Sequence, residues 1–208
     1  MISKLRGIVK PLQELLAWPF IKLKIDPNLI SIFGLLLAVI GAYFVINQEW
    51  FFALIFFLLA PAMDLIDGKV ARALNKRSNW GNYFETMIDK FVDFAMLGSL
   101  ALIYPLAGVL ALGFSMISSY AKPRVALIVI TDNRDWPAVG EHADKLLVVL
   151  VALLLAALGM NIIELLLYFV ALISAVGSVQ RMLYAKKLIK EAEKKGNLLP
   201  YIKKRKER

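Results

Sequence analysis

The sequence predicts an all-α membrane protein with six transmembrane helices and an amphipathic N-terminal helix that lies on the membrane surface. Of its 208 residues, 60% are hydrophobic, and the mean hydropathy is +0.67. Long apolar runs recur along the chain, and each approaches the ~20 residues that a helix needs to cross a bilayer. We place one membrane domain at 27–185, between an interfacial segment at 1–26 and a basic tail at 186–208.

The first 26 residues combine lysine and arginine with apolar residues at spacings of three and four. This pattern is typical of a helix that binds at the bilayer interface and keeps its charges in water. The alternative is a partly disordered leader. The amphipathic pattern favours the interfacial helix.

The predicted spans follow from the apolar runs and the residues that interrupt them. Pro27 and Asn28 break the chain and predict the start of a first span at 29–46. The second span begins near residue 50 and runs into an acidic motif, and Pro61 is expected to kink it. The remaining four spans are expected at about 82–104, 106–130, 143–158 and 162–184.

The basic residues gather on one side of these predicted spans. The short connections at 47–49, around Pro105 and at 159–161 contain no lysine or arginine, whereas both termini and the loop with Lys69 and Arg72 are basic. By the positive-inside rule, both termini and the acidic motif face the cytoplasm of a cell membrane. The net charge of +9 therefore indicates contact with anionic membrane lipids rather than nucleic acid.

Four acidic residues lie at the ends of two apolar runs, where a membrane protein tolerates charge poorly. Asp64 and Asp67 share one helix face at i, i+3, and Glu85 and Asp89 share another at i, i+4. If the two helices meet, the four carboxylates repel one another unless cations neutralise them. Oxygen ligands suit hard ions, so the pattern predicts two divalent cations, Mg²⁺ or Mn²⁺.

The residues between these acids suit a ligand that contains phosphate. Gly68 and Gly81 leave the backbone open to close approach, and Arg72 supplies a hydrogen-bond donor for phosphate. We interpret the stretch as a site for a pyrophosphate. In the alternative interpretation, Lys69, Arg72 or Lys90 forms packing salt bridges with the acids, but such pairing explains neither the glycines nor the spacing.

The spacing of these residues resembles the signature of the CDP-alcohol phosphotransferase family, also called the CDP-alcohol phosphatidyltransferases. The matching pattern is Asp64-x2-Asp67-Gly68-x2-Ala71-Arg72-x8-Gly81-x3-Glu85-x3-Asp89. The sequence departs from the family pattern once, because Glu85 stands where the family has aspartate. Glutamate keeps the negative charge and adds one methylene.

The resemblance implies an enzyme that moves a substituted phosphoryl group from a CDP-linked lipid to a small polar alcohol and releases CMP. The four acids would hold the two metals, and Asp89 would also serve as the general base on the acceptor hydroxyl. The family is commonly dimeric, which implies a homodimer. The residues implied for CDP binding are Asp64, Asp67, Gly68, Ala71, Arg72 and Gly81.

A second, basic set lies outside this motif. Residues 119–124 are similar to a serine-tyrosine-arginine stretch of family members that accept phosphorylated alcohols. The similarity implies an acceptor such as inositol phosphate or glycerol phosphate, and the alternative is that these cations simply lie at the membrane surface. His142 is interpreted as an interfacial residue, and Asp93 as an acid that supports the site or pairs helices. The residues expected to bind the acceptor phosphate are Lys122, Arg124, Lys145 and Arg181.

Two other functions stay open. Both substrates could be soluble, as in dialkylated-inositol-phosphate synthesis from CDP-inositol. A cation transporter, from a different class of protein, could use the same carboxylates. Arg72 argues against transport, because an arginine beside a cation path repels the ion. Release of CMP separates the transferases from the transporter.

Overall fold

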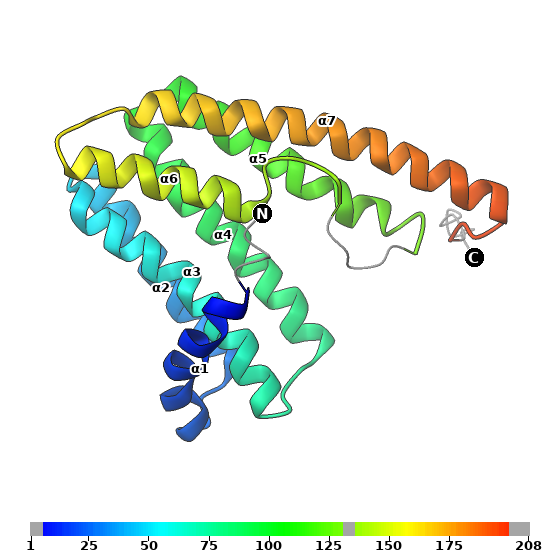
Figure 1. Cartoon of the computed structure of the whole chain (residues 1–208), viewed down its shortest axis with the longest axis horizontal. Coiled ribbons are helices and arrows are strands. Elements are labelled where there is room, and N and C mark those ends of the chain that lie inside the picture. Colours follow the sequence, from blue (N-terminus) through cyan, green and yellow to red (C-terminus); the bar gives the residue numbers. More distant parts are fainter. Residues whose placement is uncertain (1–5, 131–135, 200–208) are drawn as a thin grey trace, which may run out of the picture.

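Seven α-helices form the framework of the chain (Figure 1). The structure is a computed structural model that describes residues 6–130 and 136–199. The predicted all-α class is confirmed. In chain order the helices are α1 (Arg6–Lys22), α2 (Pro27–Ile46), α3 (Trp50–Ala73), α4 (Asn79–Ile103), α5 (Pro105–Val125), α6 (His142–Ala157) and α7 (Ile163–Lys195).

The chain is a membrane protein with several spanning helices, because α2, α3 and α7 are each long and apolar enough to cross a bilayer. Helices α4 to α6 occupy three further ranges in which the sequence predicts spans. Helix α4 is less clearly apolar, because it carries Glu85, Asp89 and Asp93. Helix α6 is shorter, with 16 residues. Length and composition thus identify three spans directly.

The end of α5 differs from its predicted range, whereas α7 ends at the glycine where the sequence favours a break. Helix α5 stops at Val125, two residues after Pro123, which removes one helical hydrogen bond from the last turn and weakens it. Helix α7 runs without a break into the predicted basic tail and ends at Lys195. It stops there because Gly196 adopts a φ of 67°, a conformation that favours glycine. Residues 1–5 and 200–208 of the two predicted terminal segments lie outside the described residues.

The helices pack in two connected groups. Helix α2 lies against α3 and α4, α5 lies along α7, and α6 joins the groups through contacts with α3 and α7 (Figure 1). Buried apolar side chains fill the space between them, with the N-terminal half of α3 at their centre. The acidic residues follow on the C-terminal half of α3, beyond this core. Large core side chains include Phe57, Leu97, Leu100, Leu153 and Leu167.

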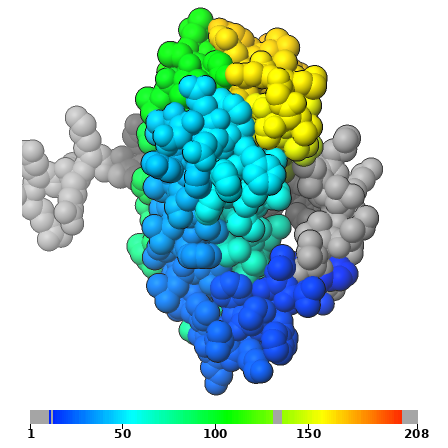
Figure 2. Space-filling view, turned by 90° about the vertical axis from the view of Figure 1, so that its left-hand side faces the viewer, coloured from blue at the N-terminus to red at the C-terminus, as the bar shows by residue number. Residues whose placement is uncertain are grey.

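Helix α1 packs across the end of the bundle that carries the acidic residues. Ala17 is buried against Ile66 and Val70 of α3, and Glu14 pairs with Lys69 at 2.7 Å. Figure 2 shows α1, in dark blue, at one end of the face that α2 and α3 form. The other side of α1 exposes Leu15, Leu16 and Trp18. An exposed apolar stripe of this kind suits a helix that lies on a bilayer.

A close approach of backbones fixes the corner between α4 and α5. A Cβ atom added to Gly108 would lie 2.3 Å from the Cα of Ala101, which is too close for any real side chain. Gly113, on the same helix, has open space at this position, with nothing within 4 Å. The two glycines therefore differ in packing while sharing a helical backbone.

This difference predicts opposite effects of the same substitution. Gly108→Ala forces α4 and α5 apart and should lower the free energy of unfolding by about 1–3 kcal/mol, the usual cost of overpacking. Gly113→Ala should be neutral or stabilising, because alanine favours a helix over glycine by ~0.5–1 kcal/mol. Thermal unfolding of both variants in detergent tests the pair. Equal melting temperatures would contradict the tight corner.

Candidate active site

Asp67 is the most buried of the four predicted acids. It lies on α3 and is 2% exposed. Ser31 of α2 donates a hydrogen bond to Oδ2 of this carboxylate. The other oxygen, Oδ1, is buried and has no hydrogen-bond partner among the described residues. An unpaired carboxylate oxygen is costly to bury, so its position marks the place where a cation would bind.

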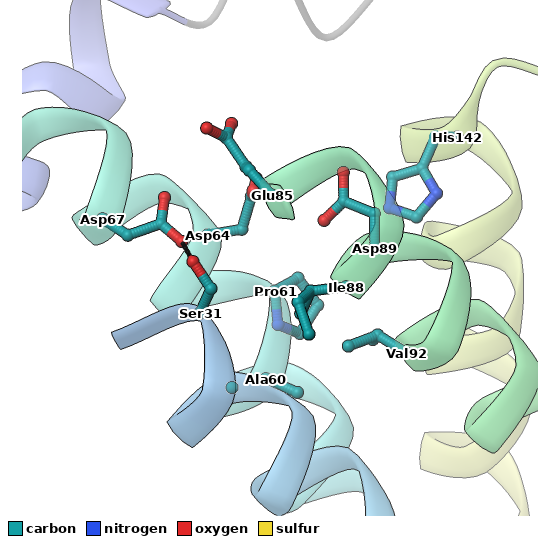
Figure 3. Close-up of a pocket in the computed structure, with 11 residues that line it drawn as sticks. Ser31, Ala60, Pro61, Asp64, Asp67, Glu85, Ile88, Asp89, Val92 and His142 are labelled. Carbon is teal, nitrogen blue, oxygen red and sulfur yellow. Dashed lines mark hydrogen bonds between the residues drawn. The ribbon is translucent and has the colours of Figure 1, made fainter. Parts of the chain in front are cut away.

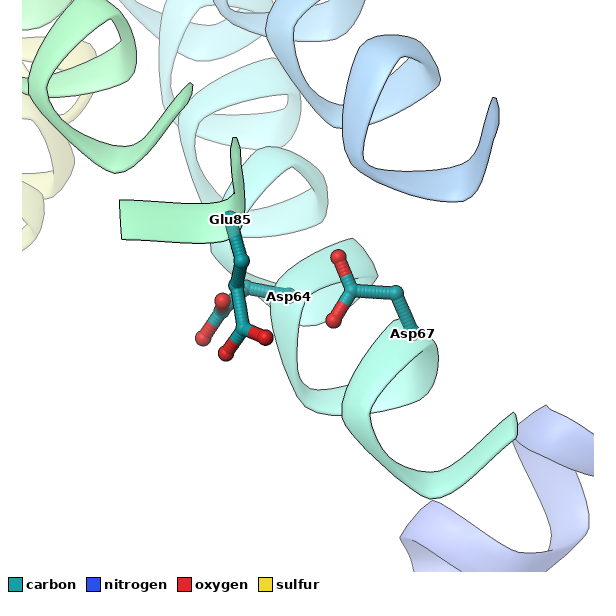
Figure 4. Close-up of side chains that lie close together, drawn as sticks. All are labelled: Asp64, Asp67 and Glu85. Atoms are coloured by element: carbon teal, nitrogen blue, oxygen red, sulfur yellow. The ribbon is translucent and has the colours of Figure 1, made fainter. Parts of the chain in front are cut away.

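Asp64 and Glu85 complete a cluster around this oxygen. One carboxylate oxygen from each of Asp64, Asp67 and Glu85 lies within 4.8 Å of the other two, as Figure 4 illustrates. Asp64 and Asp67 lie one turn apart on α3, and Glu85 reaches them from α4. Ser78 sets the start of α4 by accepting a hydrogen bond from the Gly81 N–H at 2.9 Å.

Asp89 lies beside this cluster rather than within it. Its side chain is next to that of Asp64, and both line a pocket that also contains Asp67, Glu85 and His142 (Figure 3). The structure thus brings the four predicted acids into one pocket. It places three of them at metal-ligand distances from one another and leaves Asp89 at the edge.

Two of the basic residues that could neutralise these acids, Lys69 and Lys90, are engaged elsewhere, and Arg72 lies near Glu85 without forming an ion pair with it. Lys69 pairs with Glu14 at 2.7 Å, and Lys90 pairs with Asp93 at 2.9 Å. Among the described residues, none of the ion pairs involves the four acids of the pocket. The cluster therefore fits a hard divalent cation better than it fits the salt-bridge alternative.

A second, larger pocket adjoins the carboxylates. It has a volume of about 790 Å³ and lies between the start of α2, the end of α3 and the start of α4. A Cβ atom on Gly68 would meet only the Arg72 guanidinium, at 3.7 Å, which is ordinary contact. Packing within the protein therefore does not require glycine there. Five of the six residues implied for CDP binding line this pocket, namely Asp67, Gly68, Ala71, Arg72 and Gly81, and Asp64 lines the adjoining one.

The predicted acceptor residues separate into two places. Lys145 of α6 is 6% exposed and lies close to Arg181 of α7. Arg181 donates hydrogen bonds to Ser118, including one of 3.3 Å to its carbonyl oxygen. Lys122 lies one turn beyond Ser118, so it belongs to the same face of α5.

Arg124 belongs to a different surface. It lines a groove between α5 and α7 together with Tyr120, Met182 and Lys186. Two residues along a helix correspond to a rotation of roughly 200°, so Arg124 and Lys122 point to opposite sides of α5. The structure therefore does not bring Arg124 together with Lys122, Lys145 and Arg181.

Two pocket residues were not expected from the sequence. Ser31 contacts Asp67 from a helix 36 positions earlier in the chain, and its only local signal is a hydroxyl on an apolar helix. His142, interpreted as interfacial, lines the carboxylate pocket from the first turn of α6. Asp93, interpreted as a supporting acid, is buried and binds both His142 and Lys90.

Residues 24–136 match the model of the CDP-alcohol phosphatidyltransferase family. The chain belongs to this family. It is therefore an enzyme, which argues against the cation transporter. The matched region includes the residues of α3 and α4 that line the two pockets. It ends before α6 and α7 begin.

Relatives of the chain include two synthases named for inositol phosphate lipids. The chain is 28% identical over 193 residues to archaetidylinositol phosphate synthase of Pyrococcus horikoshii, covering 90% of this chain and 97% of that protein. It is 29% identical over 189 residues to phosphatidylinositol phosphate synthase of Streptomyces avermitilis, covering 81% and 75%. A solved structure of phosphatidylinositol phosphate synthase from Mycobacterium tuberculosis, in complex with manganese and citrate, has the same fold. The TM-score is 0.71 at 18% identity, over 84% of this chain and 88% of that one.

The carboxylate cluster predicts that charge at position 67 controls metal binding. Asp67→Asn keeps the shape of the side chain but removes its negative charge, so Mn²⁺ affinity should fall at least about tenfold, a loss seen even for residues behind metal ligands. Glu164→Gln, at the exposed first turn of α7, removes one charge elsewhere and should bind Mn²⁺ like the unchanged protein. Mn²⁺ titration followed by electron paramagnetic resonance measures both. Unchanged affinity of Asp67→Asn would contradict the assignment.

Glu85, the departure from the family pattern, gives a second metal prediction. Glu85→Asp shortens the side chain by one methylene and should keep activity while changing the preference between Mg²⁺ and Mn²⁺. Glu85→Gln lacks the charge and should lose most of its activity and Mn²⁺ affinity. CMP release across a titration of each metal tests both variants. If Glu85→Gln follows the curve of the unchanged enzyme, residue 85 is not a ligand.

Proposed function

We propose that this enzyme transfers the phosphate-linked lipid of a CDP-activated lipid to a small phosphorylated alcohol and releases CMP. The observation that carries the proposal is the wall shared by its two pockets. Asp67 and Glu85 line both the carboxylate pocket and the 790 Å³ pocket. A ligand in the larger pocket can therefore extend its phosphates directly over the carboxylate cluster.

The larger pocket suits the nucleotide end of the donor. Arg72, Lys76 and Arg77 line it and offer charge-assisted hydrogen bonds to phosphate oxygens. The free space beside Gly68 suits a ligand that packs directly on the backbone. The family signature falls on this wall, and a bound donor accounts for Gly68, which packing within the protein does not require.

Asp64, Asp67 and Glu85 would hold one divalent cation, and Asp89 would be available to a second. Bound there, the cation supplies charge neutralisation of the pyrophosphate and of the departing CMP. The acceptor hydroxyl forms a bond from its oxygen to the phosphorus attached to the lipid. The bond from that phosphorus to the bridging oxygen breaks, and CMP leaves with the electron pair. Asp89 takes the hydroxyl proton.

The basic residues on α5 to α7 suit a phosphate on the acceptor. Lys122, Lys145 and Arg181 lie beyond the family signature, on the helices that would face the second substrate. Lys145 is a buried cation near Asp93, whose carboxylate is already shared with Lys90 and His142, so an acceptor phosphate would add the compensation that its burial calls for. The names of the Pyrococcus and Streptomyces relatives point to inositol phosphate as this acceptor. Glycerol phosphate carries the same charge and is the second candidate.

The remaining expectations concern the protein in its membrane. We propose that α2 to α7 all span the bilayer and that both termini and the two pockets face the cytoplasm. The basic termini and the basic loop beside the larger pocket support this orientation. The lipid of the donor is diacylglycerol or archaeol, and the enzyme is a homodimer.

The function is tested by CMP release from purified protein with Mg²⁺ or Mn²⁺. A labelled CDP-lipid is offered with inositol phosphate, glycerol phosphate, free inositol, glycerol or serine, and CDP-inositol replaces the lipid in a parallel assay. We expect transfer from the CDP-lipid and faster CMP release with the phosphorylated alcohols. Faster release with an unphosphorylated alcohol would refute the proposed acceptor class. Transfer from CDP-inositol alone would refute the lipid donor.

The separation of the basic residues predicts which of them bind the acceptor. Lys145→Gln and Arg181→Gln should each raise the acceptor KM about tenfold or more, because each removes a charge-assisted hydrogen bond from a buried site. The KM of the CDP donor should stay nearly constant. Arg124→Gln serves as the matched control on the opposite side of α5 and should leave both constants unchanged. A stronger effect from Arg124→Gln than from Lys145→Gln would place the acceptor in the α5–α7 groove instead.

A further inference from the structure

His142 is held at the edge of the carboxylate pocket by a buried acid. Its Nδ1 lies 3.0 Å from Oδ1 of Asp93, and this aspartate is 5% exposed. Lys90 occupies the other oxygen, Oδ2, at 2.9 Å. Asp93 therefore already has a cationic partner on its own helix, and neutralising its charge does not require His142.

The backbone around His142 is also fixed. Asp144 accepts a hydrogen bond from the Glu141 N–H at 3.3 Å, which sets the first turn of α6. Gly140 has a φ of 69° and packs so closely on α7 that an added Cβ would lie 2.8 Å from the carbonyl oxygen of Ile173. Helix α6 therefore starts at a defined point, and the imidazole is presented from a rigid position.

The bond to Asp93 determines which ring nitrogen a ligand can use. Nδ1 carries a proton and donates it in a hydrogen bond to the Asp93 carboxylate. Nε2 is therefore the ring nitrogen that remains for a ligand. Figure 3 shows the imidazole beside Asp89 on the pocket wall. Asp93 lies one turn from Asp89 on α4, so the general base proposed for the acceptor and the acid that holds His142 share one helix face.

We infer that His142 is a specificity-determining residue for the acceptor, which is a polyol phosphate with a hydroxyl group in addition to the attacking one. This inference rests on the proposed function. Nε2 of His142 forms a hydrogen bond with the additional hydroxyl while Asp89 faces the attacking one. Asp93 is a positioning residue, because it acts on the substrate only through the imidazole.

Two substitutions of His142 separate this role from a structural one. An asparagine amide reaches about as far as Nδ1, so His142→Asn keeps the bond to Asp93 but loses the contact at the position of Nε2. A glutamine amide reaches about as far as Nε2, so His142→Gln keeps the substrate contact and gives up the bond to Asp93. A structural role favours asparagine at this position, and the inferred role favours glutamine.

The experiment measures CMP release and both KM values for the two variants and the unchanged enzyme. With glycerol phosphate or inositol phosphate, we expect kcat/KM for the acceptor to fall about tenfold in His142→Asn, the size of one lost hydrogen bond. His142→Gln should stay within about threefold of the unchanged enzyme. The donor KM and the melting temperature should change little in both.

An acceptor without the additional hydroxyl completes the comparison. With 2-hydroxyethyl phosphate, which has a single hydroxyl, His142→Asn and the unchanged enzyme should perform equally, because the contact is absent in both. An equal loss with this acceptor, or better activity of His142→Asn than of His142→Gln with the polyols, would overturn the inference. If the unchanged enzyme releases no CMP with any alcohol, the proposed function itself fails and the inference falls with it.

The positioning role of Asp93 is measured in the same assay. Asp93→Asn removes the charge that holds the imidazole and should raise the KM for polyol phosphates, with the donor KM unchanged. The effect should again be absent with 2-hydroxyethyl phosphate. A loss of the same size for both acceptors would show that Asp93 supports the helix bundle rather than the contact at His142.

Discussion

The concentration of negative charge at the end of α3 is the constraint on which the rest of the structure depends. Asp64, Asp67 and Glu85 are held within 4.8 Å of one another in a largely apolar bundle. Such an arrangement persists only if other contacts hold it and a cation compensates it. The apolar core between the helices supplies the holding contacts, and Ser31 donates a hydrogen bond to Oδ2 of Asp67.

The positions of the cations in the second group of helices also depend on packing. Helices α5 and α7 approach each other closely along small side chains. Ser115 and Ser174 lie 3.2 Å apart at their hydroxyl oxygens, and Gly177 allows the carbonyl of Val139 to pack against α7. Arg181, one turn beyond Gly177, is thereby brought to Ser118. Small residues in the apolar part of the bundle therefore set the position of charged residues at its end.

Features that depend on a single helix can be predicted from the sequence. Helix α7 could be expected to end at Gly196, since the pattern before it contains no glycine or proline after Gly177. The pairing of Asp64 with Asp67 follows from helical pitch alone. The same pitch separates Lys122 from Arg124, because two positions along a helix point to opposite sides although they are close in sequence. Ser31 and His142 could not be inferred, since each joins the site through packing of helices far apart in the chain.

The hydrogen bond from Ser31 to Asp67 has a consequence for the modularity of this site. The family signature spans α3 and α4, yet its most buried acid depends on a hydroxyl supplied by α2. The signature alone therefore does not contain every residue that the site needs. A segment cut at its borders and placed in another helical scaffold would carry its charges without the group that fixes their geometry. A segment that keeps Ser31 together with the signature has to include α2 and its cap, Asp26. The chemistry therefore belongs to an assembly of three helices rather than to a linear motif.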